Sequence, residues 1–446
     1  MKAGRGSGGP NLMQKAQNYQ NDIEGFDVFG LDPVIMKGIM HARYDTPTPV
    51  QKEVIPLAMK GADLIGTAQT GTGKTAAFVL PILNRLIKEE KHLIRALIVT
   101  PTRELAAQID DNIRTLGRGT GIRSVTLYGG VSDLPQITAL EQGVDIVVAC
   151  PGRFIDLVYK GYVNTDNVGI LVLDEADRML DMGFLPDIKR ILQFLPENRQ
   201  SMLFSATFPP EIEALARRSL RDPKRVAIGL SKPANTVAHA LFPVEQHLKW
   251  KLLLEILKTT DTDSVLVFTR TKFRADSVMK KIKHAGYKVT SLHSNRSQAQ
   301  RQASLKGFKS GAYQIMVATD IAARGLDIDD ISHVINYDMP ATPDDYIHRI
   351  GRTGRAERTG DAFTLMTSED DQIVKRLEKI MMTKIERRYL ENFDYNASKP
   401  ENTGTNASAG KHFNPNAGKK DRRPVKSTGN SRRGSRPRYS GLNPTG

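Results

Sequence analysis

Eight consecutive residues near the start of the chain could bind a phosphate group. They are Ala68, Gln69, Thr70, Gly71, Thr72, Gly73, Lys74 and Thr75. An apolar run at 63–66 leads into this glycine-rich turn and a helical pattern at 76–80 follows it, so backbone N–H groups and a helix dipole would favour an anion. Lys74 could reach the β- and γ-phosphates of a nucleotide, and the Thr75 hydroxyl could ligate Mg²⁺. Because Ala68 stands where the general pattern has Gly, an ordinary glycine-rich turn is the alternative.

Two carboxylates, Asp174 and Glu175, directly follow four apolar residues at 170–173. Acids at the carboxyl end of a buried strand lie where α/β sheets bind ligands. Asp174 could then hold Mg²⁺ through water, and Glu175 could orient or deprotonate an attacking water. The alternative is a solvated helix start, which fits the apolar strand before it poorly. Together with the glycine-rich turn, the two acids predict hydrolysis of a nucleotide.

The elements that must position these residues alternate between buried strands and helices. Apolar strand patterns occur at 96–100, 124–128, 145–149, 169–173 and 200–204, and again at 264–268, 288–292, 314–318, 333–337 and 361–365. Continuous apolar strands separated by helices predict parallel sheets covered on both faces. We therefore expect an α/β fold with a nucleotide-binding domain at 25–230, a polar linker at 231–240 and a second domain at 241–392.

The composition of the 446 residues excludes several classes of protein. A single cysteine, Cys150, excludes a disulfide framework and is typical of a reducing compartment. The first residues lack the apolar core of a secretory signal, and no run approaches the ~20 apolar residues of a membrane helix. We expect a cytoplasmic protein that makes no membrane contact, with disordered segments at 1–24 and 393–446, where few large apolar residues occur.

The acids belong to the sequence Asp174-Glu175-Ala176-Asp177, and from about Phe26 to Leu390 the chain resembles the DEAD-box helicases of superfamily 2. The resemblance is strongest to bacterial RhlE-type RNA helicases. It implies two tandem RecA-like domains that use ATP and Mg²⁺ and act on RNA, and the family also has Ala at the position of Ala68. The other family motifs follow in order: Pro101-Thr102-Arg103-Glu104-Leu105, Gly129-Gly130, Pro151-Gly152-Arg153, Ser205-Ala206-Thr207, Thr319-Asp320, Arg324-Gly325-Leu326-Asp327, and His348 to Arg355.

The resemblance assigns adenine recognition to the segment before the glycine-rich turn. Gln51 would present a carboxamide, which is donor and acceptor together, to the adenine edge. Tyr44 would stack on the base and Phe26 would support the loop. Asp327, in the second domain, would meet the ribose.

The resemblance also implies that catalysis needs both domains. Lys74 and Glu175 come from the first domain, whereas Arg352 and Arg355 resemble arginine fingers of the second. Such arginine fingers raise the rate of hydrolysis by a factor of roughly 10³–10⁵. Hydrolysis should therefore depend on closure of the two domains.

Further residues are implied to couple ATP to RNA or to bind RNA. The coupling residues would be Ser205, Thr207, Asp177 and His348. RNA contacts to phosphate and sugar, which position a strand without reading its sequence, would come from Pro101, Thr102, Arg103, Gly130, Arg153 and Thr319. Contacts to the 2′-OH would favour RNA over DNA.

The net charge of +15 is concentrated in the C-terminal tail. Residues 397–446 hold eleven Lys or Arg and two Asp or Glu, so the tail accounts for +9. As a flexible coil it would span roughly 40 Å and could tether RNA electrostatically; a solubilising tail is the alternative.

The function that we expect is RNA-stimulated ATP hydrolysis coupled to local unwinding of short RNA duplexes or to remodelling of RNA–protein complexes. An ATP-gated RNA clamp or annealing chaperone with incidental unwinding is one alternative. A translocating DNA helicase is another, although Gln51 and Ser205-Ala206-Thr207 disfavour it. The sequence does not indicate protein partners, oligomeric state or a particular RNA.

Overall fold

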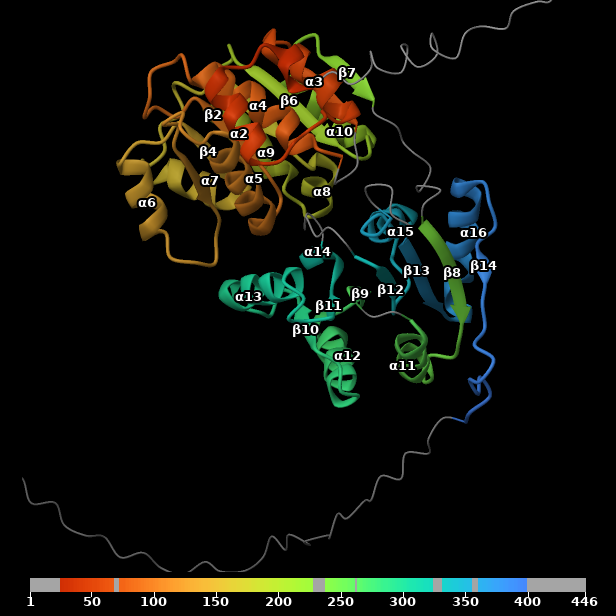
Figure 1. Cartoon of the computed structure of the whole chain (residues 1–446). Helices are drawn as coiled ribbons and strands as arrows, with labels where there is room; N and C mark the ends of the chain where they lie inside the picture. The colour runs from red at the N-terminus through yellow and green to blue at the C-terminus, as the bar shows by residue number, and fades with distance from the viewer. Residues whose placement is uncertain are drawn as a thin grey trace, which may run out of the picture. The chain divides into compact units, whose positions relative to one another are not determined.

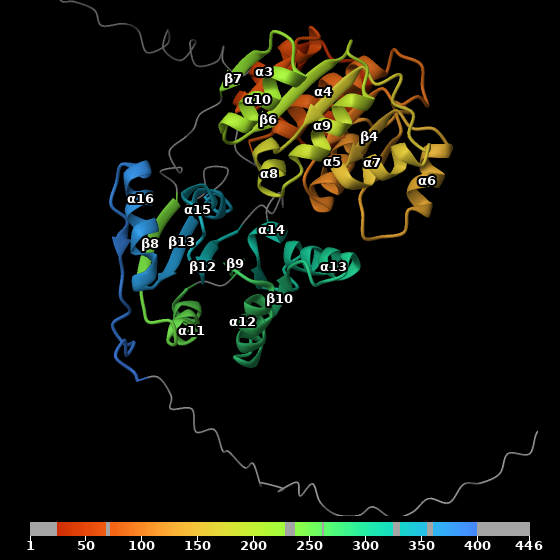
Figure 2. The same ribbon diagram turned by 180° about the vertical axis from the view of Figure 1, so that it is seen from behind.

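Two seven-stranded parallel sheets organise the computed structural model (Figures 1 and 2). One sheet lies in the first domain and one in the second, which confirms the predicted α/β fold. The structure describes residues 25–67, 72–227, 237–260, 263–323, 331–354 and 360–398. The predicted segment at 1–24 and residues 399–446 of the predicted tail at 393–446 lie outside this range, as do Ala68, Gln69, Thr70, Gly71, Asp327 and Arg355.

The first sheet has the strand order β3-β4-β2-β5-β6-β1-β7. Its strands are β1 (Leu64–Thr67), β2 (Ala96–Val99), β3 (Ser124–Leu127), β4 (Ile146–Ala149), β5 (Ile170–Leu173), β6 (Gln200–Ser205) and β7 (Lys224–Ala227). The expected strands at 96–204 agree with β2 to β6 within one residue, while the edge strand β7 was not predicted. Its burial pattern explains this, because three of its four residues are exposed.

Helices cover both faces of this sheet because its strands are apolar on both sides. Ile98 and Val172 belong to one buried cluster, and their chain neighbours Leu97 and Leu171 belong to the other. The helical segments are η2 (Phe26–Phe29), α2 (Pro33–His41), α3 (Pro49–Met59), α4 (Lys74–Leu86), α5 (Arg103–Leu116), α6 (Leu134–Glu141), α7 (Pro151–Tyr159), α8 (Ala176–Asp181), α9 (Leu185–Phe194) and α10 (Pro210–Ser219).

The second sheet has the order β10-β11-β9-β12-β13-β8-β14. Its strands are β8 (Val237–Pro243), β9 (Val265–Phe268), β10 (Val289–Leu292), β11 (Ile315–Ala318), β12 (His333–Asn336), β13 (Gly360–Met366) and β14 (Glu386–Arg387). Its helical segments are α11 (Lys249–Thr259), α12 (Lys272–His284), α13 (Gln298–Lys309), α14 (Asp320–Ala323), α15 (Pro343–Ile350), η3 (Ser368–Asp370) and α16 (Asp371–Met381).

The boundaries of the second domain differ from the prediction at both ends. Strand β8 begins at Val237, inside the expected linker 231–240, and pairs with β13 along its whole length. Ala238 and His239 make this strand look like a polar linker in sequence. At the other end Phe393 and Tyr395, expected in the tail, pack against the core of the second domain. Their rings contact each other with centroids 4.8 Å apart.

None of the described helices combines the length and apolarity needed to cross a bilayer.

Candidate functional site

The glycine-rich turn ends where strand β1 passes into helix α4. Gly73 adopts a left-handed conformation (φ 87°) as the N-cap of α4, and Lys74 begins the helix with only 7% of its surface exposed. A Cβ on Gly73 would lie 2.6 Å from Nε2 of Gln51 and 2.8 Å from Oγ1 of Thr48. A side chain at position 73 would therefore displace the residues packed behind the turn.

Gln51 lies directly against the glycine-rich turn. Its Nε2 donates to the Gly73 carbonyl at 3.1 Å, and its Oε1 accepts the Thr48 N–H at 2.9 Å in a capping box at the start of α3. A carboxamide has two donor hydrogens and an oxygen with two lone pairs. One hydrogen and one lone pair are not used by these two bonds, which is what recognition of an adenine edge requires.

The other two residues assigned to adenine lie side by side. The Phe26 ring stacks on the Tyr44 ring, with centroids 6.4 Å apart and planes 27° from parallel. Phe26 is buried at 2% exposure and belongs to the core cluster of the first domain. Tyr44 is half-buried and its hydroxyl lies 3.3 Å from Oδ1 of Asn112. The structure thus gives Tyr44 a rigid backing on one face.

Asp174 and Glu175 are both buried at the carboxyl end of β5, in the first domain. Burial raises the pKa of Asp174 to about 6, although the nearby Lys74 charge opposes this shift. Burial also acts on Glu175, but the positive charges of Arg178, Lys74 and Arg352 hold its pKa below the usual value. The Glu175 carboxyl group is therefore an anion near neutral pH, as a proton acceptor must be.

Asp177 links the acidic segment to strand β6. Its Oδ2 accepts the backbone N–H groups of Ala206 (3.1 Å) and Thr207 (2.9 Å) and faces the Thr207 hydroxyl at 3.2 Å. The Asp177 N–H in turn donates to the Ser205 hydroxyl at 3.0 Å, and that hydroxyl donates to the Thr207 carbonyl at 2.7 Å. A shift of either segment would break several of these bonds together.

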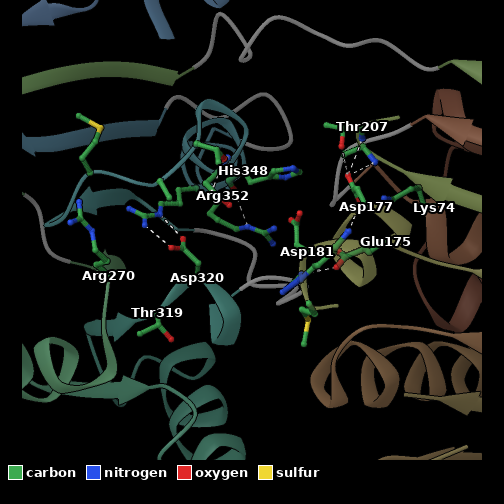
Figure 3. Close-up of a pocket in the computed structure, with 18 residues that line it drawn as sticks. Lys74, Glu175, Asp177, Asp181, Thr207, Arg270, Thr319, Asp320, His348 and Arg352 are labelled. Atoms are coloured by element: carbon green, nitrogen blue, oxygen red, sulfur yellow. Dashed lines mark hydrogen bonds and ion pairs between the residues drawn. The ribbon is translucent and has the colours of Figure 1, made fainter. Parts of the chain in front are cut away.

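Seven of the predicted site residues line one cavity of about 530 Å³ (Figure 3). The cavity is lined from both domains, and the second domain contributes the arginines Arg270, Arg349 and Arg352. Arg352 is 4% exposed and donates from Nε to the His348 carbonyl at 3.3 Å. The seven residues are Lys74, Glu175, Asp177, Thr207, Thr319, His348 and Arg352.

A magnesium ion fits the oxygen groups at the edge of this site. Asp174 supplies a buried carboxylate, and Thr75 supplies a half-buried hydroxyl in the first turn of α4. Hard oxygen ligands, few in number, are typical of Mg²⁺ sites that share the ion with nucleotide phosphates. The raised pKa of Asp174 reports a buried carboxylate that a cation would stabilise. Among the described residues, no group of three or more His, Cys, Asp or Glu could hold a metal by itself.

Several residues assigned to RNA are neighbours in the first domain. Gly130 has a positive φ of 71°, and a Cβ there would lie 2.2 Å from Nη2 of Arg103. Val131 follows Gly130 in the chain, and its carbonyl accepts a hydrogen bond from Nη2 of Arg153 at 3.2 Å. Thr102 is mostly buried and uses its hydroxyl to cap α5 by accepting the Leu105 N–H. Its hydroxyl is thus engaged in the fold.

Cys150 lies where α7 begins, one residue before Pro151, and is half-buried. Burial raises the pKa of its thiol to about 12, and the Glu104 charge adds to the shift. The thiol is therefore protonated at physiological pH and unreactive.

Two arginines for which the sequence indicated no role, Arg349 and Arg301, have several partners in the structure. Arg349 binds Asp320 with two nitrogens (2.6 and 2.7 Å) and donates from the third to Oδ1 of Asn336 and the Asp338 carbonyl. Arg301 of α13 pairs at 2.9 Å with Glu104 of α5, which also accepts from Gln298 at 3.1 Å. Arg349 lies inside the recognised segment from His348 to Arg355, but the partners of both arginines are distant in sequence.

Family models match both halves of the chain. The model for DEAD/DEAH box helicases matches residues 48–215, and that for the helicase conserved C-terminal domain matches residues 248–357. The DEAD-box ATP-dependent RNA helicase RhpA of Helicobacter pylori (strain B128) is 41% identical over 362 residues, which cover 81% of this chain and 73% of RhpA. The chain belongs to the DEAD-box ATP-dependent RNA helicases.

Other members are similar to this helicase over the same part. CshA of Geobacillus kaustophilus is 40% identical over 363 residues, which cover 81% of this chain and 78% of CshA. Among solved structures, S. cerevisiae Dbp5 bound to RNA and ADP BeF3 has a TM-score of 0.73 and 30% identity, and the match covers 82% of this helicase and 95% of the Dbp5 chain. These relationships confirm the expected family, fold and ATP-dependent RNA helicase activity.

Proposed function

We propose that RNA binding allows this helicase to complete its ATPase site and that the resulting closure unwinds short RNA duplexes locally or remodels RNA–protein complexes. The observation that carries this proposal is the cavity that Lys74 and Glu175 share with Arg352. Because each domain contributes residues to one site, ATP would be hydrolysed only in the arrangement of the two domains that brings these residues together.

In the proposed reaction a water molecule attacks the γ-phosphorus of ATP. A bond forms from the water oxygen to the γ-phosphorus, the bond from the γ-phosphorus to the bridging oxygen of ADP breaks, and Glu175 accepts the water proton. Lys74 and Arg352 stabilise the charge on the phosphate oxygens. Thr75 and Asp174 would hold Mg²⁺, which supplies further charge stabilisation when bound.

The network around Asp177 supports a coupling role for Ser205 and Thr207. Asp177 follows the proposed base Glu175 by two residues and holds the loop after β6 by three contacts. Displacement of the acidic segment by nucleotide would therefore be transmitted to that loop. His348, whose carbonyl holds Nε of Arg352, would have a similar role in the second domain.

Arg103, Gly130 and Arg153 support an RNA-binding surface on the first domain, and Thr319 lines the cavity from the second. Pro101 and Thr102 are buried, so their contribution would come from the backbone rather than from side chains. A cytoplasmic location, where RNA and ATP are both present, agrees with the single protonated thiol and remains part of the proposal.

A strand-release experiment separates unwinding from clamping or annealing. Labelled RNA duplex in excess over protein is incubated with ATP or with a non-hydrolysable analogue, and ATP turnover is counted in the same reaction. We expect many duplexes released per protein with ATP and at most about one with the analogue. Release that never exceeds the bound protein in either case would favour the clamp, and equal ATPase stimulation by DNA would favour a DNA helicase.

We also propose that the basic tail tethers RNA beside the domains. Its basis is the charge of +9 in residues 399–446, with eleven Lys or Arg. Truncation should follow Ser398, because the Ala397 carbonyl is bound by His247 at 2.8 Å and belongs to the second domain. The truncated helicase should bind RNA more weakly with a lower salt dependence, while ATP hydrolysis at saturating RNA persists. Unchanged RNA affinity at low salt would contradict the tether.

A further inference from the structure

Glu175 is held by an ion pair that the assigned motifs do not include. Nη1 of Arg178 lies 2.6 Å from Oε2 of Glu175, and the two side chains are only 7% and 8% exposed. The two residues are three apart in sequence at the start of α8. A similar pair with the same spacing, Arg190 and Asp187, lies on the surface of α9 with a separation of 3.5 Å and an arginine that is 59% exposed. Spacing alone therefore does not explain the burial of Arg178.

The guanidinium of Arg178 is directed at Glu175. Its other two nitrogens, Nε and Nη2, are buried and have no hydrogen-bond partner within the described part of the chain. A buried arginine usually satisfies most of its five donors. Within the described residues the Glu175 carboxylate is thus the hydrogen-bond partner of this buried guanidinium, and the ion pair ties the two side chains to each other.

The backbone of Glu175 does not orient its side chain in the ordinary helical way. Glu175 is the N-cap of α8 and has left-handed dihedral angles (φ 52°, ψ 53°), which non-glycine residues adopt infrequently. Strained conformations of this kind persist where surrounding contacts maintain them. The Glu175 N–H donates to Oδ1 of Asp174 at 3.0 Å and the Glu175 carbonyl accepts the N–H groups of Arg178 and Met179, so these bonds hold the backbone while the ion pair to Arg178 holds the carboxylate.

The other charges that face Glu175 are assigned to different tasks. Lys74 and Arg352 are the other cations acting on it, and Asp174 and Asp177 are its acidic neighbours along the chain. When Lys74 and Arg352 engage phosphate oxygens, Arg178 is the cation left for Glu175. We propose that Arg178 is a positioning residue that holds the Glu175 carboxylate toward the attacking water while Lys74 and Arg352 bind the phosphates; this inference rests on the proposed role of Glu175 as the base.

The first test compares Arg178→Gln, Arg178→Lys and the control Arg190→Gln in the full chain. ATP is titrated at saturating RNA, and thermal unfolding and binding of a fluorescent ATP analogue are measured in parallel. We expect Arg178→Gln to lower kcat about 10- to 100-fold with KM for ATP changed less than about twofold, because misplacing a base affects the chemical step. Arg178→Lys should restore part of kcat, and Arg190→Gln should leave kcat unchanged. Unchanged kcat in Arg178→Gln would overturn the inference.

The second test asks whether Arg178 acts through Glu175. In a Glu175→Gln background, Arg178→Gln should change the single-turnover rate less than about twofold. The same loss in both backgrounds would mean a general structural role and would overturn the inference. If Arg178→Gln does not fold, Arg178→Lys is compared in the two backgrounds by the same criterion. If Glu175→Gln alone hydrolyses ATP at the normal rate, the proposed base is wrong, which is a distinct outcome.

Discussion

The two domains of this helicase have the same strand order, yet they use the loop after their first strand in opposite ways. When the strands of each domain are numbered 1 to 7 along the chain, the strands of both sheets lie side by side in the order 3-4-2-5-6-1-7. The first strand, β1 or β8, is followed in each case by a helix whose first residue is a buried lysine, Lys74 in α4 and Lys249 in α11. The comparison of these two lysines shows what turns a shared fold into a nucleotide site.

Lys249 is bound within the fold of its own domain. Its Nζ donates to the Leu365 carbonyl at 2.7 Å and to the Tyr337 carbonyl at 3.2 Å, at the ends of β13 and β12. Burial lowers the pKa of Lys249. The glycine-rich turn that precedes Lys74 is replaced before Lys249 by Val244-Glu245-Gln246-His247-Leu248, which has no glycine. The lysine at this place in the second domain is therefore bound to the ends of two strands of its own sheet.

The residues that follow the fifth strand, β5 or β12, also differ between the two domains. The Asp174 N–H donates to the Val99 carbonyl, and the equivalent Tyr337 N–H donates to the Phe268 carbonyl, each at 3.0 Å. The next residue is Glu175 in the first domain and Asp338 in the second. Asp338 is used within its own domain, because its carboxylate accepts Nη1 of Arg274 at 2.6 Å and the Arg270 N–H at 2.9 Å. Acids at one topological position would thus serve the proposed catalysis in the first domain, whereas Asp338 serves structure in the second.

The largest expected effect comes from removing what the second domain contributes to the site. Arg352→Ala should lower RNA-stimulated turnover by roughly 10³–10⁵, with little loss of ATP affinity, because an arginine finger stabilises charge that develops in the transition state. Steady-state hydrolysis and binding of an ATP analogue measure the two quantities. Arg376→Ala, an exposed arginine of the same domain, is the control. Turnover within tenfold of the unmodified helicase would remove Arg352 from the catalytic group.

Substitutions of the two lysines should have opposite effects: one should lower ATP turnover and the other should lower stability. Lys74→Ala should lower turnover by at least about 100-fold and leave the unfolding temperature nearly unchanged, because its amine stabilises phosphate charge. Lys249→Met should do the reverse, since two buried carbonyls lose a donor at a cost of about 2–4 kcal/mol. Calorimetry measures the unfolding temperature of each variant. Steady-state hydrolysis measures turnover at a temperature where each variant is folded. A large loss of turnover in folded Lys249→Met would break the comparison.

The smallest expected effect concerns the buried carboxyl of Asp174. Its pKa is about 6 in the fold, above the ordinary value of 3.8, so the native state binds the proton more tightly than the unfolded chain does. The free energy of unfolding should therefore decrease as the pH rises from about 4 to about 6. Without nucleotide and Mg²⁺, Asp174→Asn should unfold about 2–4 °C higher at pH 7, and the difference should vanish near pH 4. An exposed residue, Asp166, provides the control as Asp166→Asn, and equal unfolding temperatures at pH 7 would contradict the assignment.

Local sequence patterns were sufficient for most of the sheet and for the residues of the site that are contiguous in sequence. The strands β2 to β6 and β9 to β13 are apolar runs, and Lys74, Asp174 and Glu175 each stand directly beside a recognisable element. The start of α2 also carries a local signal, because Asp32 accepts the Val34 N–H as the N-cap and Pro33 is the first residue of the helix.

What the sequence did not reveal depends on contacts between distant segments. Strand β8 lies in the sheet because β13 pairs with it. Phe393 packs against a core whose buried members come from Ala240 to Leu365. The contact between Glu104 and Arg301 joins residues 197 positions apart in number, and no local pattern indicates it. Arg178 is near Glu175 in sequence, but its burial depends on the tertiary fold.

The most direct test of a two-part ATPase site is single-turnover hydrolysis by Glu175→Gln in the presence of RNA. If Glu175 is the base in a site that the second domain completes, ATP and RNA should both bind and hydrolysis should fall by roughly 10²–10⁴. The stalled protein should then hold RNA in a long-lived complex that depends on ATP. Hydrolysis at the normal rate would contradict the account.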